Sequence, residues 1–173
     1  MRKWTVEEIM KTRFLDQLER ADRVSEYLDT VLPAAQPLRI LEIGSSLGCL
    51  SAKLQERHLY EIHAVEPINA DVAYCPENYR GIHLQNCRLQ DMTTYEFDTV
   101  ICVLPFVPCS ERDDFLSTLR RVMKPHAKFI CFVWKGTSFF IPGVETGCVH
   151  DMKVIVVSAS SADPGNVLAQ LTP

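Results

Sequence analysis

The chain has 173 residues, which is enough for one domain with its own hydrophobic core. Hydrophobic residues make up 47% of it and charged residues 23%, so most of the chain is not expected to be disordered. The net charge of −4 argues against a generic nucleic-acid-binding protein, because phosphate binding needs clustered lysine and arginine.

Seven cysteines are present, and no two of them have the C-x-x-C spacing. Their odd number, and the place of Cys102 and Cys131 inside apolar runs, predict reduced and mostly buried thiols. Paired metal-ligand spacing is missing, so no metal site is predicted. The N-terminus lacks the apolar core of a signal peptide, and no run approaches the ~20 apolar residues of a membrane span. These features together predict a cytoplasmic protein.

The first predicted element is helical. Thr5 and Glu8 have the spacing of a capping box, and apolar residues then recur at helical spacing until Pro33. The pattern predicts one long helix or two short ones. We expect residues 1–35 to form a helical segment that packs on the core or covers it as a lid.

The most informative stretch is 38–48, in which an apolar run stops at an acid and a turn of small residues follows. Such a run is typical of a buried parallel strand, and a small-residue turn lets the backbone approach a ligand. Glu66 ends the next apolar run, 22 residues after Gly44. An acid at about that spacing suits the hydroxyl pair of a ribose. The stretch therefore predicts a nucleoside-containing cofactor at the carboxyl edge of a parallel sheet.

The rest of the chain alternates between strands and helices. Strands are predicted at 38–43, 61–66, 81–86, 98–104 and 127–134, and helices at 48–57, 68–75 and 111–123. The stretch between the third and fourth strands is short, so no helix is predicted there. A further strand is predicted at 152–157, with 138–141 closing a hairpin through 143–147. Residues 161–173 are expected to be a frayed or weakly helical tail.

Four blocks of sequence resemble those of class I S-adenosylmethionine-dependent methyltransferases, and they occur in that family's order. Glu42-x-Gly44-x-Ser46-x-Gly48 resembles the E/D-x-G-x-G-x-G motif, whereas a dinucleotide fingerprint would need a third glycine where Cys49 stands. Residues 65–67, 95–102 and 115–125 resemble the family's second-strand end, fourth strand and the helix before its fifth strand. Ser46 replaces the middle glycine, and His126-Ala127 replaces the usual glycine pair.

The resemblance implies an α/β fold with three Rossmann-like layers, a mainly parallel sheet and an antiparallel C-terminal strand. It implies S-adenosylmethionine as the cofactor, bound by a domain of residues 36–160. The implied cofactor-binding residues are Glu42, Gly44, Ser45, Ser46, Gly48, Glu66, Pro67, Ile68, Val103, and Asn86 or Asp91 for the adenine amine. Catalytic side chains stay unassigned, since the five histidines are scattered and none is paired with a carboxylate by an obvious motif.

The acceptor pocket is expected at the end of the fourth strand. Val103-Leu104-Pro105-Phe106 resembles the N-L-P-F/Y loop of rRNA adenine dimethylases, with valine in place of asparagine, and the L-P-[FL] loop of phospholipid N-methyltransferases. Together with Trp134, these apolar residues favour a small-molecule or lipid-like acceptor. A non-catalytic methyltransferase-like subunit that binds a protein partner, and an RNA or protein methyltransferase, are the alternatives. A nucleotide-dependent oxidoreductase is disfavoured by the glycine spacing.

Overall fold

The computed structural model describes residues 5–33, 35–57, 59–93, 96–105, 107–136 and 144–158. The α-helices are α1 (Val6–Val31), α2 (Cys49–Gln55), α3 (Asn69–Tyr74) and α4 (Arg112–Val122). The strands are β1 (Leu38–Ile43), β2 (Tyr60–Val65), β3 (His83–Gln85), β4 (Phe97–Val103), β5 (Met123–Trp134), β6 (Val144–Val149) and β7 (Met152–Ser158). Short 3₁₀ turns are η1 (Pro76–Tyr79), η2 (Leu89–Asp91) and η3 (Cys109–Glu111). The expected strand 138–141 and the tail 161–173 lie outside the described residues.

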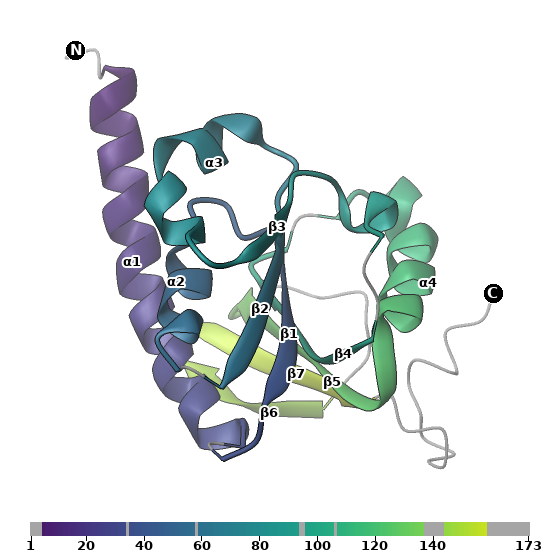
Figure 1. Cartoon of the computed structure of the whole chain (residues 1–173). Coiled ribbons are helices and arrows are strands. Elements are labelled where there is room, and N and C mark those ends of the chain that lie inside the picture. Colours follow the sequence, from purple (N-terminus) through teal and green to yellow (C-terminus); the bar gives the residue numbers. More distant parts are fainter. Residues whose placement is uncertain are drawn as a thin grey trace.

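All seven strands form one sheet in the order β3-β2-β1-β4-β5-β7-β6. Strands β1 to β5 pair in parallel, and β7 is antiparallel to both β5 and β6. Helices α1 and α2 lie against one face and α4 against the other (Figure 1). The predicted α/β fold with a mainly parallel sheet is confirmed. Because the strand order reverses between β1 and β4, their carboxyl ends form the switch point where such folds bind ligands.

Two apolar cores cover the two faces of the sheet. Alternate residues of each strand point to opposite faces, so Ile40 and Ile101 pack toward α1 and α2, while Leu41 and Val100 pack toward α4. A strand that is buried on both faces must be apolar at nearly every position, and this accounts for the continuous hydrophobic runs in the sequence.

Helix α1 is a single helix rather than two. It begins with the predicted capping box, in which the Thr5 side chain accepts from the backbone N–H of Glu8 and the Glu8 carboxylate accepts from that of Thr5. No helix breaker occurs before Pro33. Ala21, Val24 and Leu28 are buried along one line of its surface, so the packing of its C-terminal half holds it straight against the sheet.

Three expectations about the later elements need correction. Strand β3 has only three residues, and β5 begins at Met123 because a register shift between Phe97 and Thr99 lets Met123 join the sheet before Lys128. The hairpin turn lies at His150 and Asp151 rather than at 143–147. Register joins Val149 to Met152, and the left-handed backbone of His150 (φ 55°) makes a two-residue turn possible. Among the described residues, no helix is long and apolar enough to cross a membrane.

Candidate functional site

The turn after β1 is built from backbone that only glycine adopts without strain. Gly44 and Gly48 have left-handed φ values of 70° and 72°. The N–H of Gly44 donates to the carbonyl of Val65 at 2.9 Å, and that bond ties the turn to the end of β2. A Cβ on Gly44 would meet no atom within 4 Å, whereas one on Gly48 would lie 2.9 Å from the Tyr79 ring. The backbone of Gly44 is thus open to a ligand, and Gly48 is closed by packing.

Glu66, directly after β2, is held beside this turn. Its side chain accepts hydrogen bonds from the backbone N–H groups of Ser46 (2.7 Å) and Ile68 (2.8 Å). The residue is only 4% exposed. The Asn86 amide donates to the Glu66 carbonyl and fixes the backbone at this point. A carboxylate oxygen can accept more than one hydrogen bond, so both oxygens keep capacity for hydroxyl donors.

Glu42, near the end of β1, is a second buried acid. It accepts a hydrogen bond from the Ser51 hydroxyl, and it is 4% exposed. Burial, which disfavours the charged form, raises the pKa of Glu42 to about 7. At neutral pH this carboxyl is therefore poised between its two forms, and a nearby cation would favour the charged one.

The N-terminal half of α1 lies over the turn. Arg13 forms an ion pair with the buried Asp71 at 2.8 Å, and the Ser46 hydroxyl donates to the same carboxylate at 2.6 Å. Gln17 donates to the Ser46 hydroxyl at 2.9 Å and accepts from the N–H of Leu47 at 3.2 Å. These contacts join helices α1 and α3 to the turn.

Two cavities meet at the turn and share Gly44 and Val103. The first is lined by residues of α1 together with both sides of the turn, among them Gln17, Arg20, Glu42, Ser45 and Ser46. The second has a volume of about 380 Å³ and lies between the ends of β1, β2 and β4 and the start of α4. Its walls are mostly apolar and include Ile43, Val65, Pro67, Leu89, Leu104 and Pro105.

Six of the residues predicted for the cofactor line these two cavities, namely Glu42, Gly44, Ser45, Ser46, Pro67 and Val103, and five do not. Gly48 and Glu66 are packed beside the turn without lining either cavity. Ile68 is 53% exposed, and Asn86 and Asp91 are exposed and do not line either cavity. At that position the cavity is lined instead by Cys87, Arg88, Leu89 and Gln90.

The residues predicted for the acceptor separate into two places. Leu104, whose backbone is left-handed (φ 52°), and Pro105 line the larger cavity, and Phe106 lies outside the described residues. Trp134 lies at the end of β5 in another depression, where the Arg20 guanidinium sits 5.5 Å from the centre of its ring. Arg20 also lines the first cavity, so it lies between that cavity and the depression around Trp134.

Sequence reasoning missed several residues of this region. Gln17 and Arg20 were assigned only to the helical segment as a whole, and Tyr79 was not assigned at all. The Tyr79 hydroxyl lies 3.0 Å from that of Ser45 and donates to the Ser46 carbonyl at 2.5 Å. No spacing in the sequence links these residues to the turn, since they are brought there by the packing of α1 and η1.

A comparison with protein-family models matches residues 40–126 to the family described as "Methyltransferase domain". The match begins within β1 and ends in the first residues of β5, and so includes the turn and the buried acids Glu42, Glu66 and Asp71. The chain belongs to this family, and the class of protein that fold and family define is an S-adenosylmethionine-dependent methyltransferase. S-Adenosylmethionine is its cofactor.

Among curated proteins, the chain is similar to the tRNA1(Val) (adenine(37)-N6)-methyltransferase of Cytophaga hutchinsonii, with 34% identity over 92 residues. The match covers 47% of this chain and 38% of that protein, so the chain spans well under half of its relative.

Two solved structures show the fold. A TehB-like SAM-dependent methyltransferase from Corynebacterium glutamicum has a TM-score of 0.67 and 11% identity, over 87% of this chain and 96% of that one. Geranyl diphosphate C-methyltransferase from Streptomyces coelicolor, solved with S-adenosyl-L-homocysteine, has a TM-score of 0.56 and 17% identity, over 69% and 48%.

Proposed function

We propose that the chain binds S-adenosylmethionine across Gly44, with the nucleoside in the larger cavity and the methionine part beneath α1. The observation that carries this proposal is the pair of cavities that share Gly44 and Val103. The larger one has apolar walls suited to an adenine ring, and the smaller one has polar groups suited to an amino acid. Residues 36–160 form the cofactor-binding domain in this proposal.

Charge complementarity supports the placement of the methionine end. The donor carries an ammonium and a carboxylate there, and the first cavity offers the Glu42 carboxylate and the Arg20 guanidinium. An ammonium beside Glu42 would favour the ionised form of a group whose pKa is about 7. Gly44, Ser45 and Ser46 pass between the two ends of the donor, and Gly48 closes the turn.

The nucleoside end fits the second carboxylate and the apolar cavity. The ribose hydroxyls would donate to Glu66, which the backbone of Ser46 and Ile68 already holds in place. The adenine would lie between Pro67 and Val103, and its amine would reach the 87–90 segment. Asn86 and Asp91, the sequence-based candidates for that amine, contribute only if they turn inward from their exposed positions.

Helix α1 covers the site in this proposal. Arg13 and Gln17 join it to the turn and to Asp71 through the contacts described above. A covered site excludes water and fixes the orientation of the two reactants. Residues 1–35 would then act as a lid whose C-terminal half is part of the core and whose N-terminal half closes over the donor.

The acceptor that we propose is a small molecule or a lipid-like amine. The depression around Trp134 adjoins the methionine cavity through Arg20, and its other lining residues include Asp16, Glu19 and Asp151. Arg23 and His150 line the depression as well, and Arg20 already covers the Trp134 ring, so an amine-bearing headgroup would bind the carboxylates and displace Arg20 from the aromatic face. Leu104 and Pro105 form an apolar wall at the end of β4.

The chemistry needs little from the side chains. The sulfonium supplies an activated methyl group, and an acceptor lone pair forms the new bond as the bond from sulfur to carbon breaks and its electrons remain on sulfur. The chain has to hold the acceptor in line and exclude water. An acceptor that is already deprotonated needs no base.

An RNA acceptor is the second candidate, and the tRNA-modifying relative favours it. Two features oppose it. Val103 stands where the adenine-modifying loop has asparagine, and the net charge of −4 does not favour a phosphate backbone. Moreover, the match covers only 38% of that relative.

The decisive experiment has two stages. Titration of S-adenosylmethionine into the pure protein by calorimetry is expected to show one site, and NAD is expected not to bind. Incubation with the radiolabelled donor and separate extracts of metabolites, lipids and total RNA is then expected to label the metabolite or lipid fraction. Label in RNA alone would replace the acceptor proposal with the second candidate. Donor binding without transfer would favour a non-catalytic subunit.

A further inference from the structure

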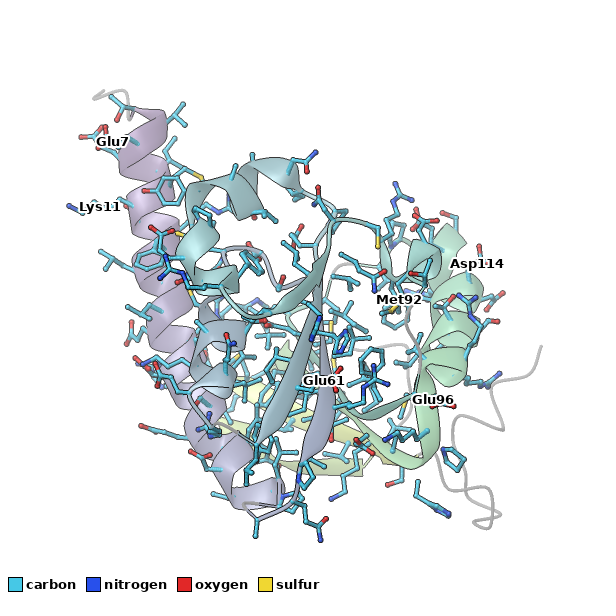
Figure 2. The ribbon with its side chains drawn as sticks, viewed as in Figure 1. Glu7, Lys11, Glu61, Met92, Glu96 and Asp114 are labelled. Carbon is cyan, nitrogen blue, oxygen red and sulfur yellow. The ribbon has the colours of Figure 1, made fainter. Side chains whose placement is uncertain are left out.

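A cluster of metal-ligating side chains lies on β2 and β3, away from the proposed cofactor site. Glu61 and His63 are two residues apart on β2 and therefore point to the same face of the sheet. His83 on β3 stands directly beside His63 in the parallel register. One ligand atom from each of the three side chains lies within 4.8 Å of the other two. Figure 2 labels Glu61 at this place.

His63 is the buried centre of the cluster, and only half of its ring is satisfied. Its Nε2 lies 2.6 Å from the Glu61 carboxylate, and its ring stacks on that of His83 with centroids 4.5 Å apart. The residue is 5% exposed, and within the described part of the chain its Nδ1 has no hydrogen-bond partner. A buried polar atom without a partner is uncommon in native proteins, and a bound ion or water is one way to satisfy it.

The cluster is accessible because the local architecture leaves it uncovered. Between β3 and β4, the described chain forms only the short turn η2, and α4 packs against β4 and β5 instead (Figure 1). His63 is buried among Phe97 and its neighbours, but Glu61 and His83 are exposed. An ion can thus approach Glu61 and His83 from solvent, and it would reach the buried His63 ring from their side.

We propose that Glu61, His63 and His83 bind a divalent transition-metal ion of the zinc type. Two imidazoles and one carboxylate are a ligand set that suits zinc, and a water molecule would complete four-coordination. Tetrahedral ligands of zinc lie about 3.3 Å apart. The Glu61 carboxylate and the Nε2 of His63, now 2.6 Å apart, would therefore have to separate to admit the ion, and the exposed His83 ring would have to turn toward it.

The positive charge of Arg39 faces the cluster and lowers its affinity for a metal ion. The Nε of Arg39 on β1 lies 3.2 Å from the Glu61 carboxylate, and its guanidinium stacks 5.3 Å from the centre of the Phe97 ring. A metal ion must share the carboxylate with this guanidinium or displace it. Neutralising Arg39 should accordingly strengthen metal binding, an effect opposite in sign to that of removing a ligand.

The metal would connect the edge strand to the sheet. Strand β3 has three residues, and His83 is its first, so a metal that joins His83 to β2 fastens the strand at its start. His63 lies three residues before Glu66, roughly 10 Å along an extended strand. The site is therefore separate from the cofactor cavities and takes no part in methyl transfer.

The test is calorimetric titration of zinc into the reduced full-length protein, in a reductant that does not bind metal. One equivalent is expected to bind. His83→Ala and Glu61→Gln, both at exposed positions, should each weaken binding by at least about tenfold, since even outer-shell changes at metal sites cost 10–100-fold. Arg39→Gln should strengthen it. Affinity for S-adenosylmethionine in the absence of zinc should be unchanged in the His83 variant.

Two control variants separate this site from adventitious binding. His126→Ala removes an exposed histidine elsewhere, and Cys148→Ser removes an exposed thiol; neither should alter zinc binding. Zinc affinity that is lost in the Cys148 variant, or unchanged in the His83 and Glu61 variants, would overturn the proposal. Because zinc binding is read without the cofactor, its failure would leave the proposed function standing.

Discussion

The neighbouring strands β1 and β2 both lead to a buried glutamate at the same edge of the sheet, yet the two carboxyl groups are held in different ways. Glu66 accepts two backbone N–H bonds, from Ser46 and Ile68, and its position is fixed by the chain itself. Glu42 has one partner residue, Ser51, which donates from its hydroxyl and its backbone N–H, and burial outweighs these bonds and raises the pKa of Glu42 to about 7. Glu66 is thus a fixed hydrogen-bond acceptor, whereas the charge of Glu42 depends on what enters the cavity.

The largest expected effect concerns Glu42 and pH. The folded protein keeps a proton on Glu42 that the unfolded chain loses above its ordinary pKa of 4.5, so stability falls as the pH rises from 4.5 to 7 and then levels off. The contribution of this one group is on the order of 3 kcal/mol. Glu42→Gln should remove that fall, as measured by urea unfolding at a series of pH values.

The same property makes cofactor binding depend on pH. Affinity for S-adenosylmethionine should rise as the pH passes through 7, because an ionised Glu42 attracts the ammonium of the donor. The Gln variant should lose this rise, and Glu56→Ala, at an exposed position after α2, should keep it. A wild-type affinity that stays flat across this range would contradict the role given to Glu42.

The turn between the two acids offers the second prediction. Gly48→Ala should destabilise the fold by about 2 kcal/mol, because the residue has a left-handed backbone and the new Cβ would meet the Tyr79 ring at 2.9 Å. Gly44→Ala carries the backbone strain alone, about 1 kcal/mol, and should instead impair cofactor binding. Chemical unfolding and calorimetry on both variants separate the two effects, and identical profiles would refute the distinction.

Glu66→Ala provides the third prediction. Removing the fixed acceptor should lower the affinity for S-adenosylmethionine by at least about tenfold, or ~1.4 kcal/mol, since hydrogen bonds to a charged group are each worth more than this. The effect should be the same on both sides of pH 7, in contrast to that of Glu42→Gln. Calorimetry on the folded variant is the measurement, with Glu56→Ala as the matched control. Unchanged affinity would show that the ribose lies elsewhere.

The smallest expected effect concerns the N-terminal half of α1, which lies over the turn beside Glu66. The Asp71 side chain is buried, but the Ser46 hydroxyl and the new Gln amide can still donate to it, so Arg13→Gln should cost about 1 kcal/mol of stability. Hydrogen exchange should nevertheless become faster in the first turns of α1, because the tie to Asp71 is lost. Arg23→Gln, whose ion pair with Glu19 lies within α1, should leave that exchange unchanged. Equal exchange in the two variants would count against a lid.

Much of the fold could be predicted because its signals are local. Strand β1 has the predicted bounds 38–43, and the capping box of α1 forms as expected. The hairpin could not be located in the same way. Gly147 looks like a turn residue but lies within β6, since the pairing of Val149 with Met152 decides where the chain reverses. No motif in the sequence paired a histidine with a carboxylate, yet His63 contacts Glu61, two residues before it on β2.

The order of strands and helices, the glycine turn and the acid after the second strand could be predicted from the sequence, because each depends mainly on residues close together in the chain. The residues that surround the turn and the acid are known only from the folded structure. The packing of α1 brought Arg13, Gln17 and Arg20 to the turn, and the parallel pairing of β2 with β3 set His83 beside His63 across 20 residues. Such neighbours depend on sheet register and helix docking, which minimise exposed apolar surface over the whole chain and leave no local spacing to be read.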